Sequence, residues 1–170
     1  WLDRIMAGRL PTPGKARLSP MVAPNGRLKG DVTVFNWGAV TWWIMGSYYL
    51  RQWHMRWFKD HIDPALDIDV TVRDISDTIV GFSLSGPNSR EVIAALTDVD
   101  ISNSAMPLMS CATMNVGLIR AKVGRLSVTG ELGYELNCHA IEHIALREML
   151  LNAGAKYGIR EYGYYALNSL

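Results

Sequence analysis

The chain has 170 residues, of which 49% are hydrophobic and 19% charged, a composition typical of one globular domain rather than of a disordered segment. Its formal net charge of +1, with lysines and arginines scattered along the chain, gives no general electrostatic basis for binding nucleic acid. The longest apolar stretch, residues 37–50, contains glycine, threonine and serine and is too short to span a bilayer.

The first part of the sequence predicts a short helix followed by a β-hairpin. Asn25-Gly26 is a strong turn signal, and it separates two runs rich in apolar and β-branched residues. The predicted elements are a helix at residues 2–7 and strands at residues 17–22 and 28–35.

Asp31 lies early in the second of these strands. Its neighbours Val32 and Val34 are apolar, and a carboxylate beside a buried face needs a physical reason. Two interpretations are open: the side chain lies on an exposed face or at a bulge of an edge strand, or it serves a ligand.

Five tryptophans lie between residues 37 and 57. A helix predicted from residue 48 to about residue 60 would place Trp53, His54 and Trp57 on one apolar stripe, opposite polar and charged residues. Most of the tryptophan rings are therefore predicted to belong to the core, and His54 to be packed rather than bound to a ligand. The alternative is an aromatic slot for a flat ligand.

The second part of the sequence mixes strands and helices without strict alternation of the two. Gly86-Pro87 begins a helix after a strand, but the glycine patterns of nucleotide-phosphate loops are missing. The predicted strands are residues 68–72, 78–84, 111–119 and 121–128, and the predicted helices are residues 88–96, 139–154 and 163–170. We therefore predict an α+β fold, a mainly antiparallel sheet with packed helices.

The cysteines and histidines predict no disulfide and no metal site. Cys111 and Cys138 stand in apolar, strand-like surroundings, so we expect buried thiols in a reducing compartment. His139 and His143 would share a helix face, but the glutamate between them does not match His-Glu-x-x-His, and a third ligand is unidentified.

Residues 125–136 contain the most informative pattern. Strand-like alternation on both sides of Gly130 and Gly133 predicts a tight connection that places Glu131 on a bend, near backbone N–H groups. A carboxylate there can accept two hydrogen bonds from a planar N–H/NH2 edge, such as that of a pterin or guanine ring. The alternative is a solvated hairpin with an ordinary surface glutamate.

The run Thr-Gly-Glu-Leu-Gly-Tyr-Glu-Leu at residues 129–136 resembles the signature of the aminomethyltransferase folate-binding family. This family includes the glycine-cleavage T-protein and the folate modules of dimethylglycine and sarcosine dehydrogenases. The resemblance spans nearly the whole chain. The further segments that agree, in order, are residues 2–5, 8–11, 26–31, 54–58 and 86–90.

The resemblance implies that the ligand is tetrahydrofolate, which receives a methylene unit from an iminium derived from an N-methyl amine. It implies that Asp31 is the catalytic residue and that Glu131 binds the pterin. Gly46 falls where the T-protein has an asparagine, and Val128 where many members have tyrosine, so both are expected to line the folate site without those side-chain contacts. Asp31 and Glu131 are expected to face one cavity.

The resemblance also implies that residues 1–170 are one folate-binding domain, truncated at both ends, of a dimethylglycine or sarcosine dehydrogenase-like flavoprotein. FAD would belong to a preceding module absent from this chain. The expected partners are that flavin module, folate and a small-molecule amine or iminium, without nucleic acid or membrane, in the cytoplasm or, in a eukaryote, the mitochondrial matrix.

One departure from the family pattern keeps a second interpretation open. Tyr165 stands where members commonly carry arginine, and the lost guanidinium would weaken binding of an anionic folate tail or change helix packing. The alternative function is a non-catalytic folate-binding module, or a regulatory or structural module, of the same fold.

Overall fold

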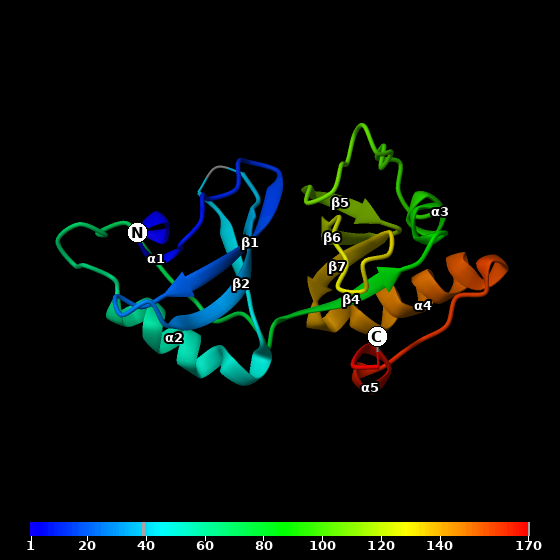
Figure 1. Ribbon diagram of the computed structural model, residues 1–170. Helices are drawn as coiled ribbons and strands as arrows, with labels where there is room; N and C mark the ends of the chain where they lie inside the picture. Colours follow the sequence, from blue (N-terminus) through cyan, green and yellow to red (C-terminus); the bar gives the residue numbers. More distant parts are fainter. Residues whose placement is uncertain (39, 170) are drawn as a thin grey trace. The chain divides into compact units, whose positions relative to one another are not determined.

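The computed structural model describes residues 1–38 and 40–169 (Figure 1). The chain divides into two compact units, Trp1–Asp77 and Thr78–Leu170. Each unit has its own sheet and its own buried apolar cluster. The expectation of a single domain over residues 1–170 stays a prediction.

The first unit contains a three-stranded antiparallel sheet in the order β1-β2-β3. Its elements are α1 (Leu2–Ile5), β1 (Lys15–Val22), β2 (Leu28–Asn36), β3 (Trp42–Met45), η1 (Tyr48–Leu50) and α2 (Arg51–Asp60). The predicted hairpin is confirmed, and Gly26 in its turn has φ +78°, a backbone conformation that glycine adopts without strain. The strand β3 was not predicted, because its uniformly apolar run lacks the alternation of a half-buried strand.

One face of this sheet packs against α2 (Figure 1). In β2, Val32 and Val34 are buried in the shared apolar cluster, whereas Asp31 and Thr33 point to the opposite face, as the period of two in a strand requires. The buried members of the cluster are Ile5, Met6, Met21, Val32, Val34 and Phe58.

The predicted burial of the tryptophans is wrong in part. Trp42 and Trp57 are partly buried and pack against the apolar cluster, as predicted, but Trp53 is 42% exposed. Its indole N–H donates to the carbonyl of Lys29 at 3.1 Å, and the Lys29 ammonium lies 5.0 Å from the ring centroid. The indole ring therefore covers the edge of the hairpin, and its N–H group is hydrogen-bonded. His54 is buried as predicted.

The strand predicted at residues 68–72 is wrong, because this segment consists of turns and irregular backbone. The aspartates around it bond to nearby backbone groups instead. Asp63 accepts from the N–H of Ala65 at 2.8 Å, and Asp74 accepts from the N–H of Ser76 at 3.0 Å. Such local bonds offer the backbone an alternative to a strand ladder.

The second unit contains a four-stranded antiparallel sheet in the order β4-β7-β6-β5. Its elements are β4 (Ile79–Ser85), α3 (Ser89–Ala94), β5 (Cys111–Val116), β6 (Ile119–Gly124), β7 (Gly133–His139), η2 (Ala140–Glu142), α4 (His143–Gly154), η3 (Ala155–Tyr157) and α5 (Tyr164–Leu167). The antiparallel sheets with packed helices confirm the predicted α+β class. The predicted helix at residues 163–170 is a single turn, and Leu170 lies outside the described residues.

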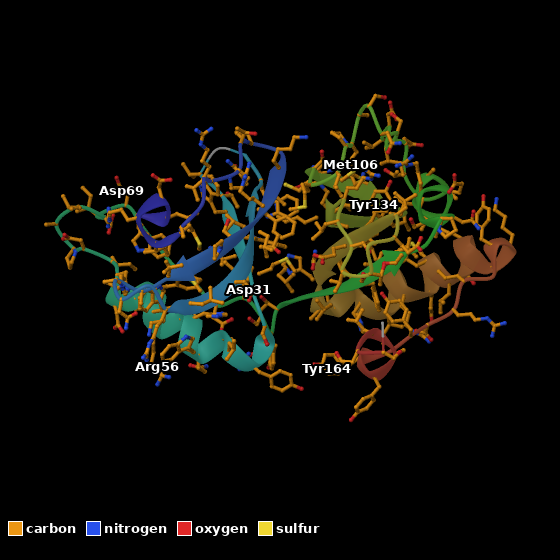
Figure 2. The ribbon with its side chains drawn as sticks, viewed as in Figure 1. Asp31, Arg56, Asp69, Met106, Tyr134 and Tyr164 are labelled. Carbon is orange, nitrogen blue, oxygen red and sulfur yellow. The ribbon has the colours of Figure 1, made fainter. Side chains whose placement is uncertain are left out.

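Helices α3 and α4 supply apolar side chains to a core shared with β7. Tyr134 and Leu136 are fully buried there, and Tyr134 is labelled in Figure 2. The Tyr134 hydroxyl accepts from Nε of Arg90 at 3.1 Å, so its polar tip is satisfied. Because Tyr134 and Leu136 face this core, Glu135 between them faces the other side of the sheet.

The strand predicted at residues 121–128 ends early, at Gly124, and residues 125–132 form the connection from β6 to β7. The backbone of Arg125 bonds outside the β6–β7 ladder: its N–H donates to the carbonyl of Ser110 at 2.7 Å, and its carbonyl accepts from the N–H of Met109 at 2.9 Å. The alternation of residues 126–128 therefore belongs to a loop.

The thiols of Cys111 and Cys138 are buried, as predicted. Burial raises the pKa of the Cys138 thiol, which disfavours the thiolate. Within residues 1–38 and 40–169, we find no helix with the length and apolar character needed to cross a membrane.

Asp67 gives the first unit a dependence on pH. Its carboxylate is buried, accepts from the Arg4 guanidinium and also accepts from the N–H of Asp63 at 2.8 Å. The bond from Arg4 holds the pKa of Asp67 below its usual value. A lowered folded-state pKa contributes stability above the unfolded value of about 4, and this stability is lost as the pH falls through the folded value.

We therefore expect Asp67→Asn to lower the midpoint of thermal unfolding at neutral pH and to flatten its fall below about pH 4. Thermal unfolding followed over a series of pH values measures both effects. Asp69→Asn is the matched control, because Asp69 is exposed in the same segment (Figure 2). An Asp67→Asn chain that keeps the parent's full acid sensitivity would contradict this role.

Candidate functional site

Asp31 lies on β2, on the face of the sheet away from α2 (Figure 2). It is exposed and stands opposite Pro20 of β1. Within the described residues, its carboxylate has no hydrogen-bond or ion-pair partner in the protein. The exposed-face interpretation is thus confirmed, and the same placement leaves the carboxylate accessible to a ligand.

An aromatic cluster shares this face of the sheet. Phe35, four residues after Asp31 on β2, stacks on Trp37 with ring centroids 5.3 Å apart and an interplanar angle of 1°. Trp37 meets Trp43 edge to face, also at 5.3 Å. Trp37 and Trp43 were predicted to belong to the core with the other tryptophans. The period of two in a strand places Phe35 on the same face as Asp31, and the two tryptophans pack on that face through Phe35.

The opposite face of β2 is supported by the buried ring of His54. A Cβ atom added to Gly30 would lie 2.6 Å from Nε2 of His54, and one added to Gly46 would lie 3.0 Å from both Nδ1 and Cε1. Nε2 is buried and has no hydrogen-bond partner among residues 1–38 and 40–169. Burial lowers the pKa of His54, and the negative charge of Asp31 opposes this effect. The imidazole is therefore a packed, neutral group near pH 7.

Gly46 follows β3 and is exposed. The His54 ring occupies the space that a side chain at position 46 would need. This contact accounts physically for glycine at position 46, where the T-protein resemblance implies an asparagine. The assignment of Gly46 to a folate site stays a prediction.

In the second unit, the loop that carries Glu131 is held by a chain of hydroxyl groups. Ser127 Oγ lies 3.2 Å from Ser85 Oγ and 2.8 Å from Thr129 Oγ1. The N–H of Thr129 donates to Ser127 Oγ at 3.2 Å, and the N–H of Glu131 donates to Thr129 Oγ1 at 3.4 Å. A Cβ atom on Gly133 would lie 2.6 Å from Cβ of Ser127, so glycine is needed for this close approach.

A second anchor holds the end of the same loop. The carbonyl of Leu132 accepts from the N–H of Gly86 at 2.8 Å and from Ser89 Oγ at 3.0 Å. These bonds join the loop to the turn between β4 and α3. The predicted strand-turn-helix unit at Gly86 thus supports the Glu131 loop from its other side.

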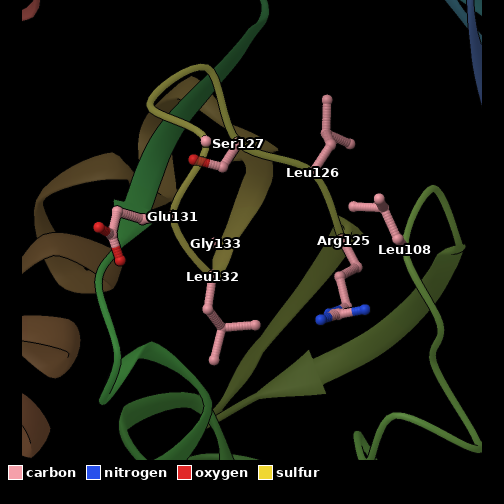
Figure 3. A pocket seen from close by; sticks show the side chains of 8 residues that line it. Leu108, Arg125, Leu126, Ser127, Glu131, Leu132 and Gly133 are labelled. Carbon is pink, nitrogen blue, oxygen red and sulfur yellow. The ribbon is translucent and has the colours of Figure 1, made fainter. Parts of the chain in front are cut away.

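The loop borders a pocket of about 270 Å³ (Figure 3). Glu131 and Arg125 are its charged lining residues, and in Figure 3 they lie on opposite sides of Leu132. The lining residues are Leu108, Arg125, Leu126, Ser127, Gly130, Glu131, Leu132 and Gly133. Val128 is 70% exposed and is not one of them, so its place in a folate site stays a prediction.

Glu135 is a candidate that the sequence analysis missed. On β7 it stands between Ser83 of β4 and Gly124 of β6, on the face away from the core. Burial raises the pKa of its carboxyl group. Asn137 lies two residues further on the same face, and its Nδ2 is buried with no hydrogen-bond partner in the part of the chain that the structure describes. A desolvated carboxyl and an unsatisfied amide on one sheet face are groups that a ligand could satisfy.

The predicted site residues are divided between the two units. Asp31 and Gly46 belong to the first unit, and Val128 and Glu131 belong to the second. The expectation that Asp31 and Glu131 face one cavity stays a prediction. Among the residues that the structure describes, no group of three or more histidine, cysteine, aspartate or glutamate side chains could hold a metal ion.

Known proteins resemble the whole chain. A family model described as GCVT N-terminal domain matches residues 1–170. Dimethylglycine dehydrogenase of Homo sapiens, named as mitochondrial, is 29% identical over 169 residues, which are 99% of this chain and 19% of that protein. Aminomethyltransferase of Geobacillus kaustophilus (strain HTA426) is 28% identical over 158 residues, which are 93% of this chain and 42% of that protein. The chain thus spans less than half the length of these relatives.

A solved structure supports the fold. The structure of heterotetrameric sarcosine oxidase from Corynebacterium sp. U-96, in complex with pyrrole 2-carboxylate, contains a chain that matches with a TM-score of 0.60. The match covers 89% of this chain and 70% of that chain, at 17% sequence identity. At this identity the likeness shows the fold alone.

The contact between position 46 and His54 can be tested by substitution. Gly46→Asn is expected to destabilise the first unit by about 1 to 3 kcal/mol, because the new side chain must displace a buried ring. His54→Ala removes that ring, so the asparagine should cost less in the double variant. Urea unfolding of the parent, both single variants and the double variant measures this coupling. Additive costs would show that the ring does not limit position 46.

Proposed function

Because this chain belongs to the GCVT N-terminal domain family, we propose that it binds tetrahydrofolate and supports transfer of a methylene unit to it from an iminium derived from an N-methyl amine. The observation that carries the proposal is the pocket on the loop of residues 125–133, where Glu131 stands in the signature segment. The names of the dehydrogenase and aminomethyltransferase relatives support the reaction class.

Glu131 is proposed to bind the pterin ring. Its carboxylate can accept two parallel hydrogen bonds from the N–H and NH2 groups on one edge of such a ring. The hydroxyl chain of Ser127 and Thr129 fixes the backbone on which this carboxylate stands. A fixed loop limits the conformational entropy lost when the ligand binds.

Asp31 is proposed to act at the reacting amine. Its carboxylate would stabilise the positive charge of the iminium and accept the proton that the amine loses as the C–N bond forms. The strand β2 is paired with β1 at Asp31 and with β3 from Thr33 onward, and is supported by the His54 ring, so it gives this carboxylate a rigid base. A rigid base keeps a charged group oriented without a reorganisation cost during the reaction.

The proposal assigns no flavin to this chain. Oxidation of the amine would belong to a flavin module elsewhere in a dimethylglycine or sarcosine dehydrogenase-like protein, with the small-molecule amine as its substrate. We propose the cytoplasm, or in a eukaryote the mitochondrial matrix, as the compartment, which fits the buried thiols of Cys111 and Cys138.

One observation favours a non-catalytic folate-binding or structural module as the second candidate. Tyr165, which stands where the family resemblance implies arginine, is 90% exposed and has its ring centroid 6.4 Å from that of Tyr164. It supplies no positive charge for an anionic ligand. Transfer activity separates the proposed catalytic domain from the second candidate, and folate binding separates the folate-binding form of that candidate from a purely structural one.

Asp31→Asn, made in the full-length protein, is expected to lower the single-turnover rate of methylene transfer by about 10²- to 10⁴-fold, the usual contribution of general acid–base catalysis. The affinity for tetrahydrofolate should change little, because the charge matters most as the iminium is captured. Rapid-quench kinetics and calorimetry measure the two quantities, with Asp69→Asn as the control. A full transfer rate in Asp31→Asn would show that Asp31 is not the catalytic residue, whereas the absence of transfer in the parent would favour the non-catalytic module.

Glu131→Gln is expected to weaken tetrahydrofolate binding by about tenfold to a hundredfold, because the amide turns one acceptor into a donor that faces the pterin's own donors. Glu135→Gln tests the missed carboxyl group in the same way, and Glu148→Gln on the exposed face of α4 is the control. Calorimetric affinities for tetrahydrofolate decide whether Glu131 or Glu135 contacts the pterin. A loss in Glu135→Gln alone would move the pterin contact to Glu135, and no loss in either would place it elsewhere.

A further inference from the structure

Arg125 stands where β6 ends and the Glu131 loop begins, and its backbone is fixed on both sides. Its N–H donates to Ser110 at 2.7 Å and its carbonyl accepts from Met109 at 2.9 Å. Met109 has φ +64°, a conformation that is rare for residues other than glycine. This local geometry directs the Arg125 side chain into the pocket (Figure 3).

The Arg125 guanidinium is incompletely satisfied. Its Nε is buried and has no hydrogen-bond partner within the described residues. Buried donors in native proteins are nearly always bonded, so an unpaired one indicates a missing partner or ligand. In Figure 3 the guanidinium lies near Leu108 and Leu132, and apolar neighbours offer it no acceptor.

The other polar groups of the pocket do not neutralise Arg125. The Glu131 carboxylate lies on the far side of Leu132 and points away from the guanidinium (Figure 3). The Ser127 hydroxyl is engaged with Ser85 and Thr129. The pocket therefore contains a positive charge with free donor capacity in apolar surroundings, and this arrangement favours an anionic group with a planar pair of acceptors.

We propose that Arg125 binds a carboxylate in this pocket and, resting on the function proposed above, that this carboxylate belongs to the p-aminobenzoylglutamate tail of the folate. Nε–H and one Nη–H form the fork that matches the two oxygens of a carboxylate. Leu108, Leu126 and Leu132 provide apolar surface for the adjoining benzoyl ring. Arg125 and Glu131 line the pocket on opposite sides of Leu132 (Figure 3), so the tail carboxylate and the pterin edge would contact separate parts of its lining.

The test uses the tail fragment without the pterin. On titration of the 15N-labelled chain with p-aminobenzoylglutamate, the Nε–H resonance of Arg125 is expected to shift. Arg125→Gln should weaken binding of this fragment by about tenfold or more, and Arg125→Lys, which keeps the charge but loses the fork, should fall between. Arg120→Gln, at an exposed arginine of the preceding strand β6, is the matched control.

A second pair of ligands separates the sources of the carboxylate. With tetrahydrofolate, Arg125→Gln should lose about tenfold in affinity, whereas 6-methyltetrahydropterin, which has no tail, should bind the parent and the variant equally. Glutarate, a simple dicarboxylate, should bind more weakly than the tail fragment. If glutarate binds as tightly, the carboxylate site stands and the tail assignment is overturned.

Two further outcomes keep the two proposals distinct. An unmoved Arg125 resonance at millimolar p-aminobenzoylglutamate would overturn the carboxylate site, even if tetrahydrofolate binds. If the fragment binds and tetrahydrofolate binds no more tightly than the fragment, the carboxylate site stands and the proposed pterin binding fails. Arg125→Lys guards against a folding defect in Arg125→Gln, and unfolding midpoints equal to the parent's in both variants exclude that explanation.

Discussion

The close approach of Ser127 to Gly133 is the contact on which the shape of the candidate site depends. Only a glycine at position 133 leaves room for the Ser127 side chain, whose hydroxyl then joins Ser85 of β4 to Thr129 within the loop. The loop is thereby fixed to β4 and β7 at once. Arg125 at its start and Glu131 near its end take their positions from this constraint, so a side chain at position 133 would disturb both without touching either.

The first unit uses glycine for a similar purpose. Gly30 and Gly46 allow the His54 ring to lie directly against the sheet, under the strand that carries Asp31. The buried, unpartnered Nε2 of His54 lowers stability, because an unsatisfied buried polar atom costs about 1 to 3 kcal/mol. The ring in turn gives β2 a rigid support on one face, while on the other face Asp31 is exposed and Phe35 is buried against Trp37.

Local signals in the sequence predicted the hairpin at Asn25-Gly26, the α+β class and the family, because turn chemistry and the run at residues 129–136 are encoded over short distances. The errors arise from contacts between distant residues. The strand β6 ends at Gly124 because the Arg125 backbone bonds to Met109 and Ser110. The alternation of apolar and polar residues in the sequence carries no information on such bonds between distant residues. Glu135 was missed because its burial depends on Ser83 and Gly124 on neighbouring strands.

Within the described part of the second unit, Arg125 Nε and Asn137 Nδ2 are buried without a hydrogen-bond partner, and the carboxyl group of Glu135 is desolvated. Each lowers the stability of the unliganded fold, and a ligand that bonds to any of them removes part of that cost. Binding to the folded state alone stabilises it by about 2.7 kcal/mol at a free ligand concentration of one hundred times Kd. Since these groups belong to the unit that carries the signature loop, stabilisation by a true ligand should be largest for residues 78–170, and hydrogen exchange of β6 and β7 would locate it.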